Sequence, residues 1–105
     1  MTNLVFIGAM VLTAYCNEGP KGCKTCCGKW APYNRTASKT APIENFTIGA
    51  SKQFPLGSWL YIESIGWRKV EDRPKKGLNI VDVYMRRHKQ AKEFGRQQRN
   101  VWLLK

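Results

Sequence analysis

The sequence is poor in acidic residues. Its 105 residues contain seven Asp and Glu against 18 Lys and Arg, which gives a formal net charge of +11. A surface of this kind favours polyanionic partners, and nucleic acid, an anionic membrane or a cell wall rich in teichoic acid and peptidoglycan carboxylates all fit. The charge alone does not choose among these partners, and it is also compatible with a role in solubility only.

The chain also lacks an apolar segment long enough to cross a membrane. The stretch from Leu4 to Leu12, LVFIGAMVL, is too short for a span, and no basic residue precedes it as a secretory signal requires. We therefore expect no transmembrane segment, and we interpret this stretch as the first strand or strands of the fold.

Histidine is nearly absent, whereas cysteine is clustered. Cys16, Cys23, Cys26 and Cys27 form a C-x6-C-x2-C-C pattern, and the single histidine, His88, lies far from them in sequence. No catalytic cysteine is indicated. Three states of the cluster stay open: two disulfides that join the adjacent pair to the other two cysteines, a structural zinc site, and free thiols. In each case we expect the cluster to hold a long loop in place.

Length and patterning predict one small β domain spanning residues 1–105, with its core in residues 10–105. Residues from Asn17 to about Asn45 are dense in Gly, Pro, Lys and Cys and predict a long loop. Short runs of β-forming residues predict strands, and one segment has helical spacing with Ala91 and Phe94 facing the core. The expected strands are Met10–Tyr15, Thr47–Ala50, Trp59–Glu63, Trp67–Glu71, Asn79–Met85 and Asn100–Leu104, and the expected helix is Arg87–Arg96. Six strands and one helix suggest a closed barrel.

The only two aspartates, Asp72 and Asp82, fall on neighbouring predicted strands with a Pro/Lys/Gly turn between them. Two carboxylates placed in this way can share one side of a small β fold, which is the arrangement that acid-catalysed glycoside cleavage needs. Structural roles are the alternative, because an Asp before a turn often forms the turn and a buried Asp can be satisfied by backbone amides.

Asp82 has apolar neighbours on both faces of its strand. Ile80 and Tyr84 share its face, and Val81 and Val83 lie on the other. A carboxylate in these surroundings loses hydration, so we expect its pKa to be raised toward neutrality, where it can act as a general acid.

Seven short motifs follow one another in an order that resembles the 3D domain, a family named for three aspartates. The motifs are Thr13-Ala14-Tyr15-Cys16, Cys26-Cys27-Gly28-Lys29, Thr36-Ala37-Ser38, Phe54-Pro55-Leu56-Gly57, Glu71-Asp72, Asp82-Val83-Tyr84 and Glu93-Phe94-Gly95-Arg96. The family includes the catalytic domain of the MltA-type lytic transglycosylases and small resuscitation-factor-like proteins of Firmicutes. The resemblance covers nearly the whole chain from Met10 to Lys105.

The resemblance implies a six-stranded double-psi β-barrel that cleaves the β-1,4 bond between N-acetylmuramic acid and N-acetylglucosamine in peptidoglycan. It assigns the acid and base role to Asp82, with Asp72 orienting it or stabilising charge on the sugar. Tyr15, Thr36 and Trp67 are candidate sugar contacts, although a core position for Trp67 fits equally well. No cofactor is required, and the implied location is extracellular, at the cell wall or on a phage virion.

The chain departs from the family pattern at three places. Ala50-Ser51 stands where the first family aspartate is expected, Asp72 is followed by Arg73-Pro74-Lys75-Lys76-Gly77 instead of a glycine-rich loop, and Lys39 replaces a common glycine. The alternative function is therefore a non-catalytic module of the same fold that binds glycan or serves as a structural part, for example of a virion.

Basic residues also surround the predicted helix. Nucleic acid is not the favoured partner, because basic residues around one short helix usually form a solvated face. The residues concerned are Arg86, Arg87, Lys89, Lys92, Arg96 and Arg99.

Overall fold

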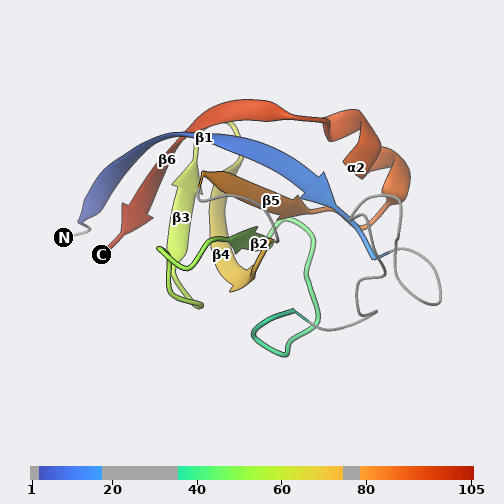
Figure 1. Cartoon of the computed structure of the whole chain (residues 1–105), viewed down its shortest axis with the longest axis horizontal. Coiled ribbons are helices and arrows are strands. Elements are labelled where there is room, and N and C mark those ends of the chain that lie inside the picture. Colours follow the sequence, from blue (N-terminus) through green and yellow to red (C-terminus); the bar gives the residue numbers. More distant parts are fainter. Residues whose placement is uncertain (1–2, 18–35, 75–78) are drawn as a thin grey trace.

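The computed structural model describes residues 3–17, 36–74 and 79–105, which form six strands and one short helix (Figure 1). The mostly β class that the sequence predicts is therefore confirmed. The elements are β1 (Leu4–Tyr15), β2 (Thr47–Ala50), β3 (Trp59–Ile62), β4 (Gly66–Asp72), β5 (Ile80–Tyr84), α2 (His88–Phe94) and β6 (Gln97–Leu104).

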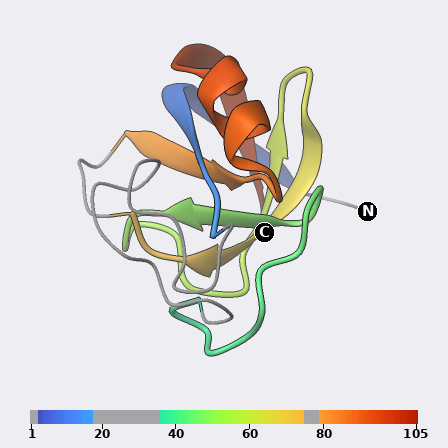
Figure 2. The same ribbon diagram turned by 90° about the vertical axis from the view of Figure 1, so that its right-hand side faces the viewer.

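The strands close into a barrel in the order β1-β5-β2-β4-β3-β6. The pairs β1/β5 and β2/β4 are parallel, and the other four pairs are antiparallel. Closure pairs both edges of the sheet, which removes most of the backbone that an open sheet exposes. Figure 2 looks at the end of the barrel where α2 lies against β1.

The core consists of the inward side chains of all six strands and one residue from the turn after β2. These side chains are Met10, Leu12, Ile48, Ala50, Phe54, Leu60, Ile62, Val70, Val81, Val83 and Val101. Phe94 of α2 packs against this cluster, and Ala91 is buried, as the helical spacing predicts. The helix is shorter than expected at both ends, because Arg87 and Gly95 form its caps.

Strand β1 changes face at a bulge between Phe6 and Gly8, where Gly8 has a φ of 121°. Glycine suits this position because a residue with a Cβ rarely adopts such a φ. Met10 and Leu12 point into the core, whereas Phe6, on the other side of the bulge, pairs with Trp102 on the outer surface. The bulge thus turns the first residues of β1 outward.

Several strand boundaries differ from the expectation, and the largest difference is at β1, which begins at Leu4 rather than Met10 because its first residues pair with β6. Strand β4 begins at Gly66 rather than Trp67, and the φ of 98° at this glycine closes the tight connection from β3. Strand β6 begins at Gln97 rather than Asn100, because its early residues pair with β1. In the described part of the chain, no helix has the length and apolar character needed to cross a membrane.

Candidate functional site

Four strands carry one row of residues across the outer surface of the barrel. Thr13 of β1 pairs with Asp82 of β5, Asp82 pairs with Gly49 of β2, and Gly49 pairs with Asp72 of β4. Paired residues on neighbouring strands point to the same side of a sheet. Gly49 has no side chain, and the Pro74 ring lies against it, with Cδ 3.3 Å from the position that a Cβ would take.

Asp82 is partly buried although it lies outside the core. Val81 and Val83 on either side of it point into the barrel, so the Asp82 carboxyl is on the outer face with Tyr84. Tyr84 packs edge-on against Tyr15 of β1 with ring centroids 5.4 Å apart. These rings cover part of the outer face near Asp82 and limit its contact with water.

The environment of Asp82 favours the protonated carboxyl. The pKa of Asp82 is raised to about 6: burial raises it most, a hydrogen bond from Thr13 lowers it, and the negative charge of Asp72 raises it. The Thr13 hydroxyl donates to Asp82 Oδ1 at 2.9 Å. At neutral pH such a group exchanges its proton readily, as a general acid and base must.

Three hydrogen bonds fix the Asp72 carboxylate. The Tyr15 hydroxyl donates to Oδ2 at 3.2 Å, and the backbone N–H groups of Ala37 and Arg73 donate to Oδ1 at 3.0 and 2.9 Å. The donors come from β1, from the segment before β2 and from the end of β4. Asp72 is therefore both a charged neighbour of Asp82 and the point where three segments meet.

A buried carboxylate beside Asp72 anchors the segment that supplies the Ala37 amide. Glu71 is 7% exposed and accepts hydrogen bonds from the hydroxyls of Thr47 at 2.7 Å and Thr40 at 3.4 Å. Thr40 in turn lies 3.0 Å from the Thr36 hydroxyl. This chain of hydroxyl groups holds residues 36–47 against β4.

Arg73 holds the turn that follows β2. Its Nη1 donates to the carbonyl oxygens of Ala50, Ser51 and Phe54 at 2.9, 2.8 and 2.7 Å. Ala50, at the position of the expected first family aspartate, is fully buried in the core and brings no polar group to the site. The cation after Asp72 thus has a structural task in this chain.

The structure brings some of the predicted site residues together and separates one. Tyr15 contacts Asp72, and Thr36 lies next to Ala37, which also contacts Asp72. Trp67 is 41% exposed and stacks edge-on against Tyr61. It precedes Asp72 by five residues on β4, about 16 Å along the strand, and it is therefore not part of the row.

The cysteine cluster is described only at Cys16. Cys23, Cys26 and Cys27 lie outside the described residues. Cys16 is fully buried, and its Sγ is 3.8 Å from Nδ1 of His88, so the distance between them in sequence is a poor guide to their distance in space. Within residues 3–17, 36–74 and 79–105, no group of three or more His, Cys, Asp or Glu is arranged to hold a metal ion.

Sequence reasoning missed Thr13, Gly49 and Glu71. Thr13 has a usable signal, because it is two residues before Tyr15 and must share its face of the strand. Gly49 and Glu71 have none, because their importance depends on a pairing of strands that are distant in sequence.

Comparison with known families finds no family model that matches the chain, and no curated protein matches it.

Proposed function

We propose that this chain is a peptidoglycan-cleaving domain of the lytic transglycosylase type, in which Asp82 is the acid and base. The observation that carries the proposal is the Asp82 carboxyl, whose pKa is raised to about 6 by burial, with Asp72 close by. One carboxyl suffices for this reaction, because no water has to be activated.

In the proposed reaction the protonated Asp82 gives its proton to the glycosidic oxygen as the bond from C1 of the muramic acid breaks. The resulting carboxylate then takes the proton of the 6-hydroxyl of the same sugar. That oxygen bonds to C1 and closes a 1,6-anhydro ring. Asp72 carries the negative charge that favours the developing positive charge on the sugar, and the Tyr15 hydroxyl donates to it.

We extend the proposal to the family. The closed barrel with parallel β1/β5 and β2/β4 pairs supports, and does not by itself establish, a double-psi barrel of the 3D type. Such a domain would act at a cell wall, outside the cell or as part of a virion. The net charge of +11 suits a wall rich in carboxylate and phosphate groups.

Digestion of purified sacculi tests the proposal. We expect the protein to release muropeptides that end in 1,6-anhydromuramic acid, identified by mass spectrometry, and we expect Asp82→Asn to release at least about 100-fold less. Glu93→Gln on α2 serves as a matched loss of one carboxylate away from the site. Full activity of Asp82→Asn, or products with reducing ends, would exclude the mechanism.

The second candidate is a non-catalytic glycan-binding or structural module of the same fold. The observation in its favour is Ala50, which is buried where the family carries its first aspartate. This function predicts that the protein sediments with sacculi without releasing sugar. It also predicts that Asp82→Asn binds as tightly as the unaltered chain.

We propose a structural role for the cysteine cluster, since Cys16 is buried beside His88. Structural zinc and disulfides give different readouts. A zinc site predicts stoichiometric zinc in the purified protein and loss of stability with a chelator, whereas disulfides predict loss of stability with a reductant alone.

A further inference from the structure

Large apolar side chains are exposed at the end of the barrel where the two chain termini lie. Among the described residues, Leu4, Val5, Phe6, Ile7, Tyr61 and Trp67 are between 37% and 57% exposed. Only two other large apolar side chains, those of Ile43 and Leu56, are equally exposed in the described part of the chain. The six clustered residues and Trp102 are called the terminal patch below.

The rings of the terminal patch form a continuous row over four strands. The ring centroids of Phe6 and Trp102 are 5.4 Å apart, those of Trp102 and Tyr61 are 5.9 Å apart, and those of Tyr61 and Trp67 are 5.3 Å apart. Since neighbouring strands are about 4.8 Å apart, the row is about 14 Å long. A contiguous patch of exposed apolar side chains often marks an interaction site, whereas apolar side chains exposed singly do not.

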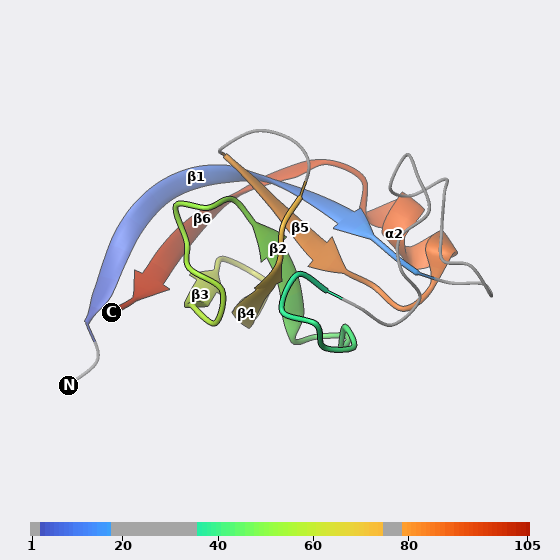
Figure 3. The same ribbon diagram turned by 60° about the horizontal axis from the view of Figure 1, so that its bottom comes forward.

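The patch is exposed in part because the first half of β1 has a neighbouring strand on one side only. Residues Leu4 to Met10 of β1 pair with β6 alone, whereas β5 pairs only with Val11 to Tyr15. Figures 1 and 3 show β1 and β6 running side by side to the chain termini. Val5, which pairs with Leu103 of β6, is 41% exposed.

Cations lie beside the terminal patch. Lys69 is two residues after Trp67 on β4, with its Nζ 6.0 Å from the Phe46 ring centroid, and Lys105 follows the last residue of β6. The whole chain carries +11, so two copies would repel each other, and a partner of opposite charge is favoured. Charge complementarity thus points to an anionic surface.

The chemistry of the patch distinguishes among anionic surfaces. Aliphatic side chains such as Leu4 and Ile7 add nothing to the stacking of sugars, and the rings of Phe6, Tyr61, Trp67 and Trp102 are tilted by 54° to 72° from one another instead of forming a flat platform. Trp and Tyr beside Lys and aliphatic residues suit the boundary between lipid headgroups and acyl chains.

We propose that the terminal patch docks this domain on an anionic lipid surface, with the apolar side chains in the acyl boundary and Lys69 and Lys105 on the headgroups. The inference does not depend on the glycan chemistry proposed above. The patch lies about 20 Å along β1 from Thr13, so docking would leave the row of Asp72 and Asp82 free.

Vesicle flotation tests the proposal. We expect the protein to float with vesicles of phosphatidylglycerol and phosphatidylcholine, and to stay behind with phosphatidylcholine alone or at high salt. Phe6→Ser combined with Tyr61→Ser, and Lys69→Glu combined with Lys105→Glu, should each lower the partition coefficient about tenfold or more.

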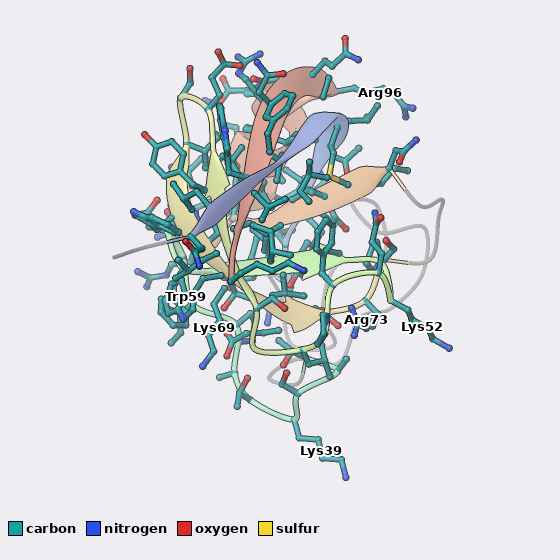
Figure 4. All side chains as sticks on the ribbon, turned by 90° about the vertical axis from the view of Figure 1, so that its left-hand side faces the viewer. Lys39, Lys52, Trp59, Lys69, Arg73 and Arg96 are labelled. Atoms are coloured by element: carbon teal, nitrogen blue, oxygen red, sulfur yellow. The ribbon has the colours of Figure 1, made fainter. Side chains whose placement is uncertain are left out.

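Each pair has a matched control away from the patch. Ile43→Ser with Leu56→Ser removes equally exposed apolar groups, and Lys52→Glu with Arg96→Glu reverses two cations that Figure 4 shows away from Lys69. Circular dichroism checks that each variant is folded. If Phe6→Ser with Tyr61→Ser is unfolded, Lys69→Glu with Lys105→Glu decides the test. Equal losses in patch and control variants would overturn the proposal. The proposal would also be overturned if the protein formed a dimer in lipid-free solution that Phe6→Ser with Tyr61→Ser dissociates. It would likewise be overturned if the patch variants lost binding to sacculi while the unaltered chain bound no vesicles.

Discussion

The hydroxyl of Thr13 and the carboxyl of Asp82 form the contact that most directly tunes the proposed chemistry. The hydrogen bond stabilises the ionised carboxylate and so opposes the effect of burial on the pKa of Asp82. A β1 side chain that is 69 residues away in sequence therefore offsets part of the rise in the pKa of Asp82 that burial causes.

Replacing Thr13 by valine should raise the pKa of Asp82. Valine keeps the shape of threonine but cannot donate, and the loss of a hydrogen bond worth about 1 kcal/mol raises the pKa from about 6 by roughly 0.7. NMR titration of the Asp82 carboxyl carbon measures the change. Ser58→Ala, which removes an exposed hydroxyl bonded to the Pro55 carbonyl, should leave the value unaltered. A pKa that stays or falls in Thr13→Val would show that the Thr13 bond does not govern Asp82.

Asp82 should also make folding pH-dependent. Its pKa is about 6 in the folded chain and 3.8 ordinarily, so folding is favoured most below pH about 4, and that advantage disappears as the pH rises through 6. The full cost of the ionised carboxylate is about 3 kcal/mol. We expect Asp82→Asn to be more stable than the unaltered chain at pH 8 by up to about 3 kcal/mol.

Urea denaturation at pH about 4, 6 and 8 measures this effect. The difference between Asp82→Asn and the unaltered chain should shrink as the pH falls, because both side chains are then neutral. Glu93→Gln provides the control for loss of one exposed carboxylate. A constant difference at all three pH values would mean that the pKa of Asp82 is not raised by folding.

At the scale of elements, the strands were predictable and their connections were not. Strand β2 has the predicted bounds, Thr47–Ala50, and it begins with the β-branched residues Thr47 and Ile48. The importance of Gly49 and Glu71 was not predictable, since it arises when β2 takes a place between β4 and β5. Local patterns specify how residues alternate along a strand, and long-range packing selects which strands become neighbours.

The segment before β2 should depend on the Thr47 hydroxyl. This group is fully buried, donates to Glu71 Oε1 and accepts the Ile43 N–H at 2.8 Å. We expect Thr47→Val to cost about 2 to 3 kcal/mol, because it leaves both partners unsatisfied, and to lower activity through the displaced Ala37 amide. Thr47→Ser keeps the hydroxyl and should cost only about 1 kcal/mol for the lost methyl group. Chemical denaturation compares the two, and equal costs would show that the hydroxyl is not what holds the segment.

The turn after β2 should depend on Arg73 in a similar way. One guanidinium nitrogen contacts the carbonyl oxygens of Ala50, Ser51 and Phe54, and a lysine ammonium at this position lies one bond closer to the backbone and does not reach all three. We expect Arg73→Lys to cost about 2 to 4 kcal/mol. Arg96→Lys, on the exposed residue after Gly95, should cost less than about 0.5 kcal/mol. An equally small cost for Arg73→Lys would show that Arg73 does not hold the turn after β2.

For the whole molecule, the sequence predicted the class better than the arrangement. Alternating β segments predict a closed barrel, yet nothing in them shows that the first half of β1 extends past β5 and contributes to the terminal patch. The cause is the bulge at Gly8, which sends Phe6 outward although it has the same spacing from Leu12 as an inward residue. A glycine inside a strand signals such a change of face without giving its direction.

The two ends of the barrel should act independently, because the terminal patch and the row from Thr13 to Asp72 share no side chain. We expect Asp82→Asn to bind anionic vesicles as the unaltered chain does while it fails to cleave glycan. We expect Lys69→Glu with Lys105→Glu to cleave soluble glycan fragments at the unaltered rate while it fails to float. Measuring cleavage and vesicle binding on both variants tests the two proposals separately. If the unaltered chain binds vesicles but cleaves no glycan, the enzymatic function is excluded and the docking surface is supported. Coupled losses in both variants would instead show that the two ends form one site.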